Sequence, residues 1–202
     1  MGLDRKWQAI PHEWNIFRDA MSDGRFWSFF EFIPTYFERG CRPLRQDDDE
    51  EQAFCNALKI LMFAHPGIEA RYFYPPGRNF DAVHFLLSET RRNGYMNKDA
   101  DDLGTHAIRG ARPLPEPLSD SGYIRYSDPA DVLKIAEFLA PITESDLKYN
   151  YDPLEMDKSV YKFIADRADE TKWYDIWEEF QGMRAVYLKA AEHHEGVLAI
   201  LS

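Results

Sequence analysis

The chain has few cysteines and no long apolar segment. Its 202 residues include two cysteines, Cys41 and Cys55, which belong to no paired motif, so we expect reduced thiols. No stretch approaches the ~18 uninterrupted apolar residues of a membrane-spanning helix, and residues 1–14 lack the apolar core of a secretory signal. These absences predict a cytoplasmic protein that does not enter a membrane.

Basic residues are also scarce. The chain has 24 Lys and Arg against 35 Asp and Glu, for a net charge of −11. This balance argues against a nucleic-acid partner, since phosphate backbones are bound by basic surfaces. The excess of acid lies beyond residue 46, because residues 1–46 hold 7 basic and 6 acidic side chains.

The sequence lacks the common catalytic and cofactor motifs. It contains no G-x-S-x-G, C-x-x-C, G-x-G-x-x-G or Walker lysine loop. The group His193-His194-Glu195 invites a metal, but neighbouring residues on a helix point about 100° apart, so the two imidazoles are poorly placed to share an ion. We expect a solvated helix end there, with no metal and no cofactor.

Local signals predict several helices. Asn79 precedes an amphipathic run to Arg92, and Asp128-Pro129 opens a helix that should end at Leu139. The longest helix is expected from Glu170 to His194, with Trp173, Trp177, Phe180 and Tyr187 on its buried stripe. The acidic residues 47–51 lead into another amphipathic helix.

Strands are fewer and shorter. We expect them near 3–9, 122–126 and 197–201, the last central or next to central in the sheet because it is wholly apolar. Residues 1–202 are therefore interpreted as one α+β domain with a small, mostly antiparallel sheet wrapped by helices.

Four segments together resemble a known family. They are FDAVHFLL at 80–87, GYIRYSDPADV at 122–132, YDPLEMDKSVYKF at 151–163 and AAEHHEGVLAILS at 190–202. In this order they resemble the YfbM-like family of bacterial cytosolic proteins, a domain of unknown function, over about 79–202 and more loosely over 1–11. The resemblance implies a fold but no activity, and residues 22–76 are interpreted as a helical elaboration outside it.

The first candidate binding site is the acidic run Asp47, Asp48, Asp49, Glu50 and Glu51. One interpretation is the first turn of a helix, where acids oppose the helix dipole. The other is a docking patch for a basic protein, in which such charges speed association.

The second is the aromatic run at 26–37. A helix there would place Phe26, Phe29, Phe30, Ile33 and Phe37 on one face and leave Trp27 and Phe32 off it. The off-stripe residues either meet a second layer of the core or form an exposed interface.

The third candidate is a pocket near His84, Tyr123 and Tyr126. His84 lies on an apolar helix face, which is typical of a hydrogen-bonded core histidine and also of a group with a shifted pKa.

Together these features favour a non-enzymatic acidic interaction module, an inhibitor or immunity-type protein for a basic bacterial toxin. The alternative is a small-molecule-binding protein or enzyme with an aromatic-lined pocket.

Overall fold

The computed structural model describes residues 5–23, 26–75, 79–92, 101–113 and 124–201. One five-stranded sheet has the order β2-β1-β5-β4-β3, and every neighbouring pair in it is antiparallel. The strands are β1 (Arg5–Ile10), β2 (Tyr72–Phe73), β3 (Arg112–Pro113), β4 (Ile124–Ser127) and β5 (Gly196–Leu201). The expected α+β class is confirmed.

Strand β5 is the middle strand of the sheet, as its apolar sequence predicts. It pairs with β1 on one side and β4 on the other, and Val197, Leu198, Ala199 and Ile200 are fully buried. A strand buried on both faces needs no polar alternation, which explains its apolar run.

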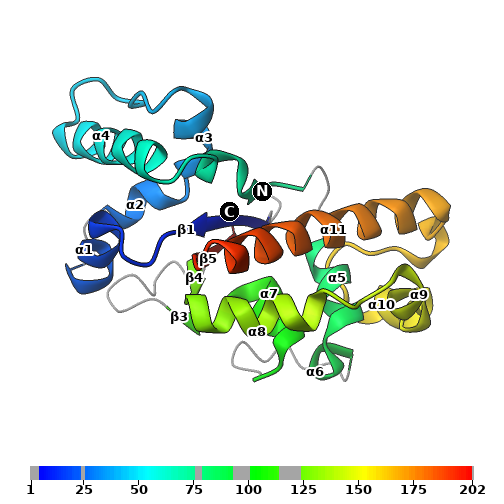
Figure 1. Ribbon diagram of the computed structural model, residues 1–202. Coiled ribbons are helices and arrows are strands. Elements are labelled where there is room, and N and C mark those ends of the chain that lie inside the picture. Colours follow the sequence, from blue (N-terminus) through cyan, green and yellow to red (C-terminus); the bar gives the residue numbers. More distant parts are fainter. Residues whose placement is uncertain (1–4, 24–25, 76–78, 93–100, 114–123, 202) are drawn as a thin grey trace.

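Helices cover both faces of this sheet. The first group contains α1 (Asn15–Asp23), α2 (Trp27–Phe30), α3 (Ile33–Glu38), α4 (Asp49–Ala64) and the 3-10 turn η1 (Ile68–Ala70). The second contains α5 (Phe80–Leu87), α6 (Glu89–Arg92), α7 (Leu103–Arg109), α8 (Pro129–Leu139), α9 (Glu144–Tyr149), α10 (Pro153–Ser159), η3 (Ala165–Arg167) and α11 (Glu170–Glu192). Figure 1 shows α3 and α4 at one end of the molecule and α9 and α10 at the other.

Hydrogen bonds show which elements cover which face. Trp7 of β1 donates from Nε1 to the Ala107 carbonyl of α7 at 2.9 Å, and Tyr187 of α11 donates to the same carbonyl at 3.0 Å. On the opposite face, Tyr126 of β4 packs on Phe17 of α1, with ring centroids 4.6 Å apart. The sheet therefore separates α7 and α11 from the α1–α4 group.

Two of the expected helices are interrupted. The run after Asn79 splits into α5 and α6, because Ser88 is extended and its hydroxyl accepts from the Arg91 amide, which starts a new turn. The aromatic run forms α2 and α3 rather than one helix. Pro34 occupies the first turn of α3, a position that proline tolerates.

Within the described part of the chain, no helix is long and apolar enough to cross a bilayer.

Candidate functional site

Helix α4 presents a continuous stripe to solvent. Its exposed members recur at helical spacing and are called here the α4 face: Asp49, Ala53, Asn56, Ile60 and Phe63. Ile60 is 70% exposed and Phe63 is 90% exposed. A helix of a folded domain usually turns such side chains inward. The α4 face is therefore acidic at the start of the helix and apolar near its end.

The opposite side of α4 fixes the helix in place. Phe54 and Leu58 are fully buried, and the Phe54 ring lies 5.5 Å from Phe29 and 5.3 Å from Phe30, centroid to centroid. These contacts show that Phe29 and Phe30 pack in the core. Because these contacts fix the orientation of α4, the residues of the α4 face are held toward solvent.

The acidic run divides into structural and exposed members. Asp48 is the N-cap of α4, and its carboxylate accepts from the Glu51 amide at 2.9 Å. Asp47, Asp49 and Glu50 are exposed. The local signal for a helix start is thus confirmed, and three acids remain on the surface.

Glu51 is fully buried and takes no part in a surface. Its carboxylate accepts from the Tyr36 hydroxyl at 2.8 Å and from the amides of Leu44 and Arg45 at 2.7 and 2.9 Å. Burial opposes the charged form, but these donors hold the pKa of Glu51 below its ordinary value. The same burial and hydrogen bond raise the pKa of the Tyr36 hydroxyl. Through these hydrogen bonds Glu51 connects the loop before α4 to α3. It is therefore not part of the docking patch expected at residues 47–51.

The two aromatic residues off the expected helix stripe, Phe32 and Trp27, differ in how much of them the structure describes. Phe32 is 38% exposed, and its ring lies edge-on to Tyr36 with centroids 6.5 Å apart. Trp27 begins α2, but its side chain lies outside the described part of the structure.

His84 is part of a buried polar cluster. Its Nε2 lies 2.9 Å from the Thr105 hydroxyl and its Nδ1 lies 3.9 Å from an Asp81 oxygen. Both His84 and Thr105 are 2% exposed, and the Thr105 hydroxyl donates to Asp102 at 2.8 Å. Burial lowers the pKa of His84 to about 3, so its imidazole is neutral at physiological pH. The core interpretation of His84 accounts for all these contacts.

The other members of the expected pocket lie elsewhere. Tyr126 is 2% exposed, and its hydroxyl is hydrogen-bonded to His12 Nδ1 at 2.9 Å. Its side chain lies on the face of the sheet opposite to α7, whereas His84 contacts Thr105 of α7. Tyr123 lies outside the described residues. The structure therefore does not bring His84 and Tyr126 together.

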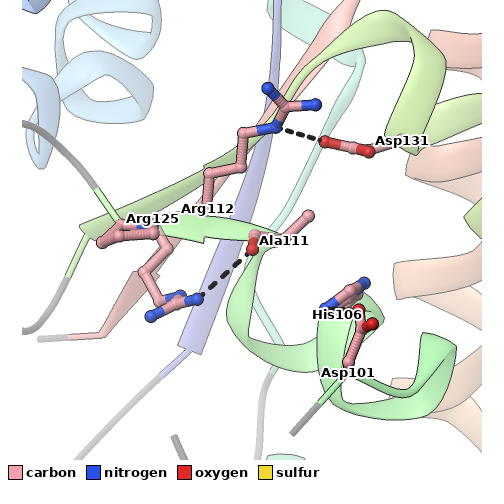
Figure 2. A pocket seen from close by; sticks show the side chains of 7 residues that line it. Asp101, His106, Ala111, Arg112, Arg125 and Asp131 are labelled. Atoms are coloured by element: carbon pink, nitrogen blue, oxygen red, sulfur yellow. Dashed lines mark hydrogen bonds and ion pairs between the residues drawn. The ribbon is translucent and has the colours of Figure 1, made fainter. Parts of the chain in front are cut away.

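A polar cavity of about 310 Å³ lies beside the β3–β4 pair. It is lined by Asp101, His106, Ala111, Arg112, Pro113, Arg125 and Asp131. Figure 2 shows the guanidinium groups of Arg112 and Arg125 pointing to different sides of Ala111. Arg112 donates to Asp131 at 2.7 Å, and this contact raises its pKa, whereas Arg125 donates to the carbonyls of Gly110 and Ala111. Sequence reasoning missed this site because its residues come from α7, the β3–β4 pair and α8, which only the tertiary fold brings together.

A second cavity, of about 560 Å³, lies at the start of α11. Its lining includes Tyr151 and Trp173, whose rings meet edge-to-face at 5.0 Å, together with Lys148, Ala168, Asp169 and Glu170. The Lys148 ammonium lies 5.2 Å above the Trp173 ring. This is the aromatic-lined cavity in the structure that best matches the small-molecule alternative.

The terminal histidine pair lies at an exposed helix end. His193 is the C-cap of α11, and His194 follows it with a φ of 54°. In the part of the chain that the structure describes, no three His, Cys, Asp or Glu side chains gather as metal ligands would.

Comparisons with known proteins support the fold and the family. The structure of a protein of unknown function, YfbM from Escherichia coli, is similar with a TM-score of 0.61 at 10% identity, covering 98% of this chain and 99% of that chain. At that identity the similarity shows the fold alone. No curated protein matches the chain.

A family model described as a domain of unknown function, DUF1877, matches residues 44–200. The match extends the similarity from 79–202 back to residue 44, so α4, η1 and β2 lie inside the matched region rather than in an elaboration outside it. The resemblance expected from the sequence is confirmed, and the chain belongs to the DUF1877 family.

Proposed function

We propose that the protein is a non-enzymatic interaction module that binds a basic protein through the α4 face. The observation that carries this proposal is the exposure of Ile60 and Phe63, at 70% and 90%, on a helix whose other side is packed. Apolar side chains exposed together on one helix face are typical of an interface. In this proposal they insert into the partner.

Charge complementarity determines the class of partner. The exposed acids Asp47, Asp49 and Glu50 lie at the start of the same helix, and the whole chain has a net charge of −11. The basic side chain of Arg45 near these acids is paired with Asp48 at 3.1 Å, and Lys59 is an exposed basic residue further along α4. A basic partner would be attracted to this end of α4 during the encounter.

The finer form of the proposal is an inhibitor or immunity-type protein for a basic bacterial toxin, acting in the cytoplasm. Its supports are the acidity, the exposed anchors and two cysteines that remain free thiols. Acidic partners of this kind act by covering a basic surface, which requires no catalytic group.

Affinity capture from the native cell tests the class of partner. Wild-type protein should retain a basic protein that the double variant Ile60→Ser, Phe63→Ser loses, because most binding energy comes from a few buried anchors. Tyr149→Ser is the matched control, since Tyr149 is also 90% exposed but lies on α9. Equal capture by all three proteins would place binding away from the α4 face.

Association kinetics test the role of charge. Replacing Asp47, Asp49 and Glu50 by Asn and Gln should lower the on-rate and weaken its dependence on salt, because exposed charges act over a Debye length of ~8 Å. The off-rate should stay close to wild type. An on-rate unaffected by these changes would contradict steering by this end of α4.

A small-molecule function is the second candidate, favoured by the cavity of about 560 Å³ that Tyr151 and Trp173 help to line. Aromatic walls with a few polar groups suit a planar polar ligand. Recovery of a co-purifying metabolite without any basic protein would favour this candidate, and loss of the metabolite in Trp173→Leu would place it in this cavity.

A further inference from the structure

The cavity of about 560 Å³ at the start of α11 has a lysine seated on its aromatic wall. The Lys148 ammonium lies 5.2 Å from the centroid of the Trp173 ring and 3.1 Å from a carboxylate oxygen of Glu144. Both Lys148 and Trp173 line the cavity. The protein therefore already places one of its own cations where a bound ligand would meet the indole.

The aromatic wall is held in a fixed orientation. The Trp173 indole donates from Nε1 to Glu144 at 2.7 Å, and its ring meets Tyr151 edge-to-face with centroids 5.0 Å apart. Tyr151 in turn lies edge-on to Phe163, at 6.3 Å between centroids. A wall that is ordered before binding spares a ligand the cost of ordering it.

The charged groups around this wall are mostly acidic. Asp169 and Glu170 line the cavity and are exposed, and Lys148 is the basic residue of the described lining. Burial raises the pKa of Tyr151, and the negative charges of Asp169 and Glu170 raise it further, so both carboxylates act on the aromatic wall. This balance of charge favours a cationic ligand over an anionic one.

Lys148 can make way for such a ligand. Its side chain is 46% exposed, and its partner Glu144 lies one turn earlier on α9. Exposed ion pairs of this spacing hold a side chain only weakly, and the lysine stem is flexible. Trp173 is 5% exposed with Lys148 over it, so a turn of Lys148 toward solvent uncovers the indole to the cavity.

We propose that this cavity binds a planar organic cation, a guanidinium group, which replaces the Lys148 ammonium over Trp173. A guanidinium stacks its flat face on an aromatic ring and donates from its edge, so one group can use both the indole and a neighbouring carboxylate. The cavity volume is within the usual range for small-molecule sites and leaves room for an alkyl substituent. The inference rests on the second candidate function, because it names the ligand class of that cavity, and it does not depend on the α4 face.

Nuclear magnetic resonance titration with ethylguanidinium chloride, at constant ionic strength, tests the ligand class. The assigned indole N–H of Trp173 reports from the cavity wall, and its resonance should shift to saturation. Ethylurea is the control ligand, because it has nearly the same planar shape without the charge. It should bind at least tenfold more weakly, since it lacks the cation–π attraction and the charge-assisted hydrogen bonds.

The Lys148→Ala variant distinguishes a cation site from an anion site. Removing the lysine takes away both the competing occupant and a like charge, so ethylguanidinium should bind about threefold more tightly or better. A site built around Lys148 for an anion would instead leave the cation weakly bound in both proteins. Weaker binding of ethylguanidinium to Lys148→Ala than to wild type would overturn the proposal.

A pair of glutamate variants tests the acidic side of the cavity. Glu170→Gln should weaken the binding of ethylguanidinium about threefold, because it removes a charge from the lining. Glu178→Gln is the matched control, since Glu178 is also exposed on α11 but lies outside the described lining, and it should bind as wild type does. Equal effects of the two variants would contradict a site at this position.

The two ligands also separate this inference from the function on which it rests. Equally tight binding of ethylurea and ethylguanidinium would overturn the cation class and leave the cavity as a small-molecule site. A Trp173 resonance that neither ligand shifts would overturn the inference and remove this cavity from the second candidate function as well.

Discussion

At the scale of single residues, burial is tolerated where hydrogen bonds match the charge state. Glu51 and Asp81 are buried and remain anionic, because each accepts several hydrogen bonds that hold its pKa low. His84 is buried and neutral, because desolvation outweighs the attraction of Asp81. Each of these groups therefore makes folding depend on pH in its own window.

His84 should make the protein less stable as the pH falls below neutrality. Its pKa is about 3 in the folded protein and 6.5 in the unfolded chain, so between these values only the unfolded chain binds the proton. Stability contributed by the neutral imidazole is full above pH 6.5 and is lost as the pH falls toward 3. Between pH 7 and 5 this loss should be about 2 kcal/mol, because the limiting slope is about 1.4 kcal/mol per pH unit.

Urea unfolding of wild type and His84→Gln between pH 7 and 5 checks this expectation. The variant should lose less stability over that interval, since it removes the titrating group. His193→Gln, at the exposed end of α11, should follow wild type. Parallel curves for wild type and His84→Gln would show that His84 takes up its proton without unfolding.

The residue scale also shows how much of the candidate site the sequence could predict. The acidic run 47–51 was recognisable as a helix start, because acidic side chains oppose the helix dipole there; that Asp48 is the residue that caps α4 is seen only in the structure. The sequence could not show that Glu50 is exposed and Glu51 is buried. Glu51 is buried because its carboxylate accepts hydrogen bonds from the Tyr36 hydroxyl and from two amides of the preceding loop. That difference is a tertiary effect with no local signal.

At the scale of elements, helices with strong local signals form as the sequence predicts. Asp128 caps α8 through the amides of Ala130 and Asp131, with Pro129 in the first turn. Helix α11 begins at Glu170 as expected and ends at Glu192. The break at Ser88 was missed, because Ser88 bonds to the distant Asp102 and Thr105. The break near Ile33 was signalled by Pro34, which does not fit inside a helix.

Helix α11 should depend strongly on Phe180. This side chain is fully buried, and it stacks on Trp177 with centroids 5.3 Å apart. Phe180→Ala should lower the free energy of unfolding by about 3–5 kcal/mol, through lost burial and the cavity left behind. Tyr174→Ala on the same helix is the control, since Tyr174 is 61% exposed and its loss should cost less than about 0.5 kcal/mol. Similar losses for both variants would mean that helix propensity, not packing, dominates.

At the scale of the whole molecule, the two ends of the chain meet in the middle of the sheet. Strands β1 and β5 pair along their full length, from Arg5 opposite Leu201 to Ile10 opposite Gly196. The central pairing is therefore the contact most distant in sequence, and the chain must close nearly its whole length to form it. Such closure is a main cause of slow folding.

A circular permutant should keep the structure and fold faster. Joining Ser202 directly to Met1 leaves residues 202 and 1–4 between Arg5 and Leu201, a length that suits a β-hairpin loop. New ends between Ala140 and Pro141, both exposed, lose only the turn bond from the Ile142 amide to the Leu139 carbonyl. The free energy of unfolding should therefore stay within about 2 kcal/mol of wild type. Stopped-flow refolding should be faster than wild type, because the β1–β5 pairing becomes local. As a control, a permutant opened inside α11, between Gly182 and Met183, should not fold. Equal refolding rates for wild type and the first permutant would contradict the prediction, and would show that β1–β5 pairing follows the rate-limiting step.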